Sequence, residues 1–477
     1  MADPAVQAAA YQRKLFELFA EFFRRSTGTE VKKFATLENF DEVVRSRAAD
    51  LRSRAIDAHR WMDMELKQFY ARESANAFII AQKIGGLKLV QGGGSRFHRS
   101  QFDSVRGSLL YADTVLVPDP VLPWLEVHRQ EERFRNVLLL QAVFSILHLK
   151  PLVDAELPYP AVFVFPSFEK ILEEKDEQTQ KGTKLLVANL FANYVDHGLQ
   201  TLDDVSALVK SDPDHFLKEV DRHKLFIAPG GPLDEPLHKA LERYERDLAT
   251  WRSHDWLDQY RKLSTPVRVL SGILERVSPQ YHLLENSEEL GSHPLLSIEQ
   301  QAHYFRLISA TNSARLARLG VLGRNRQSLI DGFGREQLRW LCQVPIEALV
   351  ELRKNNENAA FRKRMETVVM TMHDSAIEDM DRVAAEVSRE LSGAIADHKR
   401  EIRDVRDRYS RIHGQTAVSA WASLGAMLIP SLAPFLGVAA PLAIATKYAY
   451  NKVEERSEKK VLSKSLMGVL ACVKSVD

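Results

Sequence analysis

The chain has 477 residues, 45% of them hydrophobic, with 65 Lys and Arg against 64 Asp and Glu. This length exceeds what one hydrophobic core supports and predicts two to four domains, while the apolar content excludes global disorder. The balanced charge excludes an overall basic field, so nucleic acid is not indicated as a partner.

The two cysteines, Cys342 and Cys472, are far apart, and neither has a metal-spaced histidine beside it. This usage fits a reducing cytosol and argues against a zinc site or a disulfide framework. The N-terminal segment has no early basic region before an uninterrupted apolar core, so it does not resemble a secretory signal. We therefore expect a cytoplasmic protein without a metal or other cofactor.

Residues 1–84 are predicted to form N-terminal helices. Asp3 followed by Pro4 is a favourable helix start, and a second helical stretch from about 37 to 84 ends at Gly85. An apolar stripe rich in aromatics recurs at helical spacing in the first helix. We expect this stripe to pack in the core, with membrane contact as the alternative; its members are Leu15, Phe16, Leu18, Phe19, Phe22 and Phe23.

Residues 85–184 are predicted to form a small α+β region. Short apolar runs at Leu87–Val90, Leu109–Val117 and Ala161–Phe165 indicate three buried strands, and Arg133–Leu149 indicates a helix between the second and third. Three short strands among helices predict a small sheet within about 85–165.

A glycine-rich segment follows the first predicted strand, and its backbone N–H groups are suited to cradling an anion. Its spacing matches neither the GxxxxGK[ST] nor the GxGxxG pattern, so we favour a flexible hairpin tip. A second basic group lies in a later loop. The candidate anion-binding residues are Arg96, His98 and Arg99 beside Gly92–Gly94, and Arg324 and Arg326.

Asp113 and Asp119 flank the second predicted strand, where α/β enzymes often place acid/base or metal-binding groups. No histidine or second acidic motif stands at a recognisable distance, so turn formation is the favoured role, above all for Asp119 in a VPDP sequence. Together with Arg96 and His98 they are the candidates for an enzyme, which is the least favoured class. We assign no catalytic residue.

Residues 185–358 are predicted to be helical, with short segments that begin at sensible caps such as Asp212 before Pro213. The preceding Glu173–Lys184 is predicted as a solvated loop or helix end. Five histidines occur in this region without a metal-binding spacing, and we interpret them as surface or capping residues: His215, His223, His238, His254 and His282.

Residues 361–412 are predicted to form a long charged helix with a heptad seam, which would assemble with a second copy or a partner. The seam is represented by Val387, Leu391, Ile402, Val405 and Tyr409.

The 33 residues from Gly414 to Thr446 contain no Asp, Glu, Lys or Arg, and they dominate the last predicted unit, residues 413–477. Prolines at 430, 434 and 441 disfavour a straight transmembrane helix and favour an apolar helical hairpin. The alternative is a hairpin buried in a soluble domain or oligomer. An amphipathic segment, Val461–Val473, follows it. The predicted membrane-contacting residues are Trp421, Leu424, Met427, Leu428, Ile429, Phe435, Leu436, Leu442 and Ile444.

The sequence therefore predicts a mainly α protein, locally α+β, with a stalk and an apolar hairpin. This layout, over about the last 110 residues, resembles that of pore-forming toxins and bacterial membrane-acting defence effectors, and it carries no functional residues over. We expect a non-enzymatic effector, conditionally or peripherally associated with the inner membrane, that forms a homo-oligomer or binds a partner protein and contacts lipid. The alternative is a soluble oligomeric scaffold or sensor subunit.

Overall fold

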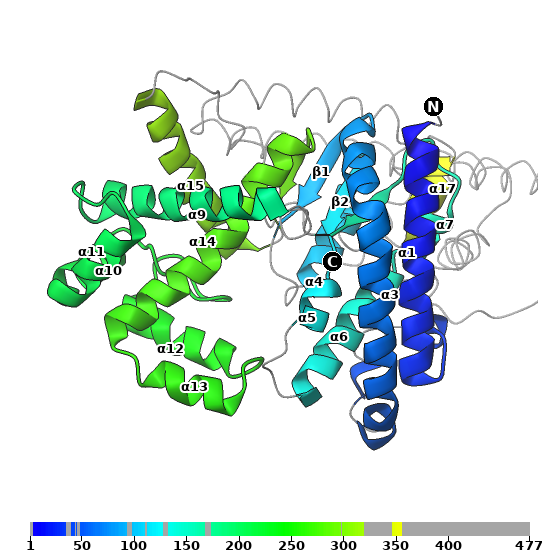
Figure 1. Ribbon diagram of the computed structural model, residues 1–477, viewed down its shortest axis with the longest axis horizontal. Coiled ribbons are helices and arrows are strands. Elements are labelled where there is room, and N and C mark those ends of the chain that lie inside the picture. The colour runs from blue at the N-terminus through cyan, green and yellow to red at the C-terminus, as the bar shows by residue number, and fades with distance from the viewer. Residues whose placement is uncertain are drawn as a thin grey trace, which may run out of the picture.

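The computed structural model describes residues 3–34, 40–42, 44, 48–92, 98–109, 112–126, 132–166, 173–296, 298–318 and 346–354. Over these residues the protein is mainly helical and carries a small four-stranded parallel sheet (Figure 1). The predicted stalk, the hairpin, and Arg324 and Arg326 lie outside the described residues. No helix among the described residues combines the length and the apolar character needed to cross a bilayer.

Two long helices form the N-terminal part: α1 (Pro4–Thr27) and α3 (Ala48–Lys83), which run side by side, with the short 3₁₀ helix η1 (Val31–Lys33) after α1 (Figure 1). Asp3 caps α1, because its Oδ1 accepts the Ala5 N–H at 2.9 Å. The aromatic stripe of α1 is buried, so its prediction as core is confirmed.

The four strands are β1 (Lys88–Gln91), β2 (Thr114–Pro118), β3 (Val162–Phe165) and β4 (His293–Leu295). They lie in the order β3-β2-β1-β4, and every neighbouring pair is parallel. The first three lie in the region predicted to contain a sheet. The fourth was missed, because its three residues include a proline; Pro294 is tolerated since β4 is an edge strand.

The prediction of a hairpin tip after β1 is wrong. Because β1 and β2 are parallel, the chain must cross over between them, and α4 (His98–Ser108) makes this crossover. The second predicted strand also began too early. The Leu109 N–H bonds to the Val105 carbonyl at the end of α4, and β2 starts only at Thr114. Apolar periodicity alone does not separate the end of a buried helix from a buried strand.

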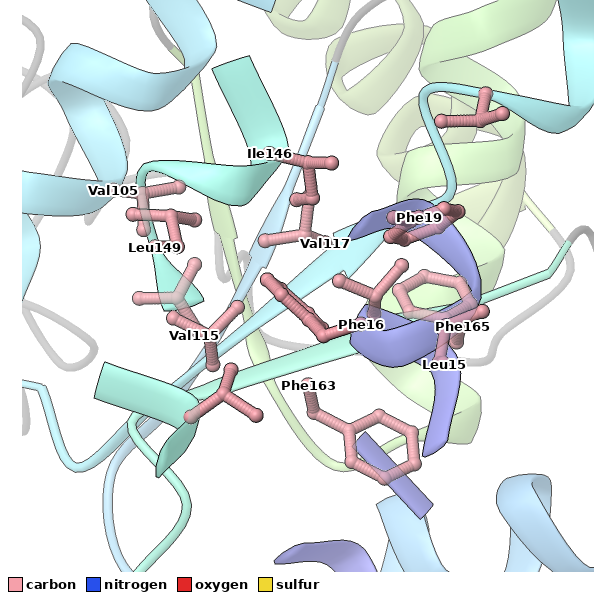
Figure 2. Packing of buried hydrophobic residues seen from close by; sticks show 14 of the residues in the cluster. Leu15, Phe16, Phe19, Val105, Val115, Val117, Ile146, Leu149, Phe163 and Phe165 are labelled. Carbon is pink, nitrogen blue, oxygen red and sulfur yellow. The ribbon is translucent and has the colours of Figure 1, made fainter. Parts of the chain in front are cut away.

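The crossover from β2 to β3 contains α5 (Leu122–Glu126), α6 (Glu132–Leu147) and α7 (Lys150–Asp154). Figure 2 shows Phe16 and Phe19 of α1 packed against strand residues such as Val117. We call this core, which joins α1, α3, the sheet and its crossover helices, the sheet-side cluster. It also contains Leu283, Leu290, Leu295 and Leu296, which lie more than 100 positions after β3 in the chain.

A helical unit is inserted between β3 and β4 and has a hydrophobic core of its own, the helix-side cluster, which includes Phe191, Phe216 and Tyr244 (Figure 1). The predicted helical character of this region is confirmed. The segment Glu173–Lys184 forms the first turns of its first helix. The helices are α9 (Glu173–Tyr194), α10 (Leu202–Ser211), α11 (Pro213–Arg222), α12 (Leu237–Leu248), α13 (His254–Arg261) and α14 (Thr265–Glu289).

After β4 come α15 (Glu299–Arg318), which packs on α14 and α9, and α17 (Ile346–Lys354), which packs on α7. Arg353 of α17 is buried and donates to the carbonyl oxygens of Leu109 and Ala112 at 3.2 and 2.8 Å. This side chain ties α17 to the turn between α4 and β2.

The outer edge of the sheet is closed by a side chain. Gln12 of α1 is buried and pairs with the Val164 backbone like a neighbouring strand: its Nε2 donates to the carbonyl and its Oε1 accepts the N–H, both at 2.9 Å. Gln12 therefore satisfies the outward-facing backbone groups of Val164 on the edge strand β3 and fixes α1 against the sheet.

Replacing Gln12 by leucine should lower the free energy of unfolding by about 2–4 kcal/mol, because the Val164 N–H and carbonyl would be buried without partners. Urea unfolding followed by circular dichroism measures this. The same change at the exposed Gln68 on α3 should cost less than about 0.5 kcal/mol. Equal effects at the two positions would contradict the edge-closing role.

Candidate functional site

The strand order places a topological switch point between β1 and β4. From β1 the chain adds β2 and β3 on one side, and then returns to add β4 on the other side. In open parallel sheets, ligands bind outside the carboxyl ends of the strands at such a point. The carboxyl ends of β1 and β4 are Gln91 and Leu295, and α4 begins on the same edge at His98.

Gly92 lies at the centre of this edge. Its N–H donates to the Leu295 carbonyl at 2.8 Å, which extends the pairing of β1 with β4. A Cβ atom at this position would lie 2.5 Å from Leu283 Cδ2 and 2.9 Å from Leu296 Cδ2. The close packing therefore requires glycine, and two leucine side chains fill the space beside it.

Two buried amides hold the backbone where the glycine-rich segment begins. Gln91 Nε2 donates to the Gly92 carbonyl at 3.0 Å, and Gln101 Nε2 of α4 donates to the same oxygen at 3.3 Å. The backbone of His98 and Arg99 forms the first turn of α4 on this edge, and Arg96 lies outside the described residues.

Asp119 follows β2 on the same edge, but its contacts are those of a cap. One oxygen accepts the Val121 and Leu122 N–H groups at 2.7 and 3.3 Å, at the start of α5. The other accepts the Tyr70 hydroxyl of α3 at 2.5 Å. The buried carboxylate thus ends β2, begins α5 and anchors α3, which is the turn-forming role predicted for it.

Asp113 lies at the opposite end of β2. Its Oδ2 accepts the Leu87 N–H at 2.9 Å, just before β1. The length of β2 separates it from Asp119, so the structure does not bring the two predicted acidic residues together. Each serves the backbone at its own end of the strand.

The phenols near Asp119 are held in their protonated form. Burial raises the pKa of Tyr70 well above its ordinary value, and the charge of Asp119 raises it further. Burial likewise raises the pKa of Tyr11, whose ring stacks on Phe163 with centroids 5.3 Å apart. Tyr70 therefore acts as a hydrogen-bond donor that stabilises the carboxylate, and not as a base.

Sequence reasoning missed several buried polar residues that have a common role. Gln12, Lys88 and Arg353 each donate to backbone carbonyls; the Lys88 Nζ reaches those of Ala81 and Gln82 at the end of α3, both at 2.9 Å. Burial lowers the pKa of Lys88. The sequence signal for such a position is a polar residue inside an apolar run, as Lys88 is in LKLV.

The histidines of the helical unit are not gathered into a metal site. Over the described part of the chain, no group of three or more His, Cys, Asp or Glu side chains has the arrangement needed for a metal ion.

Two surface pockets lie away from the switch point. One, of about 420 Å³, lies between the first turns of α1 and the connection from α7 to β3. The other, of about 350 Å³, lies between α1 and α3 around Trp61 and Phe69.

Comparisons with models of protein families, with curated proteins and with solved structures gave no match to this chain. The site is therefore interpreted from its own geometry and chemistry.

We expect Asp119→Ala to lower the free energy of unfolding by about 2–4 kcal/mol, since it removes a helix cap and leaves the buried Tyr70 hydroxyl unpaired. Tyr70→Phe should cost about 1–2 kcal/mol. The double variant should cost less than the sum, because the two side chains share one interaction. Denaturant unfolding of the three variants measures this coupling. The exposed Asp258→Ala is the control, and strictly additive effects would contradict the assignment.

Proposed function

We propose that this protein is a non-enzymatic bacterial effector that acts on or docks to a membrane through its C-terminal apolar hairpin. The observation that carries the proposal is the 33-residue run from Gly414 to Thr446 without a charged residue. Pro430 and Pro434 divide it into two arms, each too short for the roughly 30 Å of hydrocarbon that about 20 helical residues would cross. Such arms suit a hairpin that enters one leaflet or inserts conditionally.

The chemistry of the described body supports a role without catalysis. The buried polar side chains with the clearest contacts, among them Gln12, Lys88, Asp119 and Arg353, serve backbone groups. A body of this kind is suited to receiving a signal and passing it to the C-terminal segments.

Flotation with anionic liposomes and release of a trapped dye test the membrane role. We expect the full chain to bind, and Leu428→Lys to weaken binding roughly a hundredfold, since one charge within the hydrocarbon costs about 3 kcal/mol. The matched control is Leu263→Lys, because Leu263 is 43% exposed on the body. Equal binding by the full chain and by a chain lacking residues 414–446 would overturn the proposal.

The alternative is a soluble scaffold or sensor subunit that assembles through the heptad seam with a second copy or a partner protein. Light scattering separates the two. A stable oligomer that Val387→Asp and Leu391→Asp dissociate, together with no binding to liposomes, would favour the scaffold.

A second proposed role is ligand binding by the body of the protein. We propose that the switch point binds a phosphate-bearing small molecule such as a nucleotide. The parallel arrangement of β1, β2 and β4 supports this, because it puts the glycine-rich connection between a strand end and the start of an 11-residue helix. Backbone N–H groups at a helix start attract anions, and His98 and Arg99 begin that helix.

Thermal shift and calorimetry with ATP, NAD and pyrophosphate as probes test this role. The variant His98→Ala with Arg99→Ala should bind at least tenfold more weakly than the unchanged chain. The matched control is His238→Ala with Arg246→Ala, the same two residue types exposed on α12. No response to any probe, or equal binding by the two double variants, would contradict the proposal.

A further inference from the structure

The helix α14 belongs to both hydrophobic cores. Its first half contributes Ile273 and Val277 to the helix-side cluster, and its second half contributes Leu283 to the sheet-side cluster. Leu284 packs against both. α15 also reaches both cores, with Phe305 in the sheet-side cluster and Tyr304 and Ile308 in the helix-side cluster, so α14 is one of two helices that connect the helical unit to the sheet.

A proline lies at the boundary between these halves. Pro279 is inside α14, two residues after Val277 and four before Leu283. It has no N–H group, so the carbonyl of Glu275 loses its helical partner, and bending is easiest at such a position. We call the turn from Arg276 to Gln280 the joint.

The joint contains the buried guanidinium of Arg276, and some of its N–H groups have no hydrogen-bond partner. Arg276 is 8% exposed; its Nη1 donates to the Gly272 carbonyl at 2.8 Å, and its guanidinium lies 4.0 Å from the ring centre of Tyr244. Nε and Nη2 have no hydrogen-bond partner in the described structure. The Tyr304 hydroxyl lies close to this guanidinium, and the charge and hydrogen bonding of Arg276 oppose the burial-driven rise in the pKa of Tyr304.

The complementary acceptor stands one turn later. Gln280 is 2% exposed, and its Oε1 has no hydrogen-bond partner among the residues that the structure describes. Side chains four residues apart on a helix are neighbours, so Arg276 and Gln280 are within reach of one another across Pro279. Leaving Nε and Nη2 of Arg276 and Oε1 of Gln280 buried without partners costs free energy that a hydrogen bond between the two side chains would recover.

We infer that α14 is a jointed element with two arrangements: the one seen here, with Arg276 on the aromatic rings, and a second in which rotation at Pro279 pairs Arg276 with Gln280. The second arrangement displaces Leu283, whose methyl group lies against Gly92. The joint would then open or fill the space beside Gly92 at the switch point, a consequence that rests on the ligand-binding role proposed above.

Distances between spin labels on the two units test the joint. In the full chain, with Cys342→Ser and Cys472→Ser, labels are attached at the exposed positions Gln68→Cys on α3 and Glu242→Cys on α12. Double electron–electron resonance without any ligand should give two distance populations. Pro279→Ala should leave one narrow population, because the interrupted turn becomes a continuous helix.

Gln280→Glu should shift the populations toward the second arrangement at least tenfold, since a carboxylate pairs more strongly than an amide with the guanidinium. Gln259→Glu, the same change at an exposed position of α13, is the matched control and should leave the distances unchanged. One unchanged distance in all these proteins would overturn the inference. Because the measurement contains no ligand, its outcome is independent of whether the switch point binds phosphate.

Discussion

The structure depends on one pairing between distant parts of the chain, that of β4 with β1. The Gly92 N–H reaches the Leu295 carbonyl at 2.8 Å, and Gln91 and Leu295 are 204 positions apart. This pairing satisfies the inner edge of β1, closes the sheet-side cluster with Leu295 and Leu296, and returns the chain from the helical unit. The position of the helical unit and the shape of the switch point follow from it.

Around that pairing, polar side chains take the place of missing backbone partners. Gln12 pairs with a backbone N–H of the edge strand β3, and Lys88 donates to a carbonyl at the end of α3. Asp119 accepts an N–H at the start of α5. A sheet of four short strands has many backbone groups at its edges, and each one buried without a partner costs about 1–3 kcal/mol. The residues that in isolation suggest chemistry are therefore occupied in holding the backbone.

Local features of the sequence predicted the elements well, and non-local pairing explains what was missed. Asp3 and Asp212 marked helix starts because a cap acts within three residues of itself. Three features depend on residues that are far away in the chain: the parallel pairing of β1, the strand at Pro294 and the strand-like role of Gln12. Local apolar periodicity does not predict such contacts. The glycine-rich segment shows the effect, since the parallel pairing of β1 with β2 places it in a crossover to α4 and not in a hairpin.

The distance along the chain between β1 and β4 also sets an order of events during synthesis. The exposed edge of β1 stays unpaired until the whole helical unit has left the ribosome, and long-range strand pairing of this kind is slow. The core of the helical unit is completed later still, because it includes Tyr304 and Ile308 of α15, which follows β4. The uncharged run beginning at Gly414 is made after both, so the body can close before this apolar segment appears.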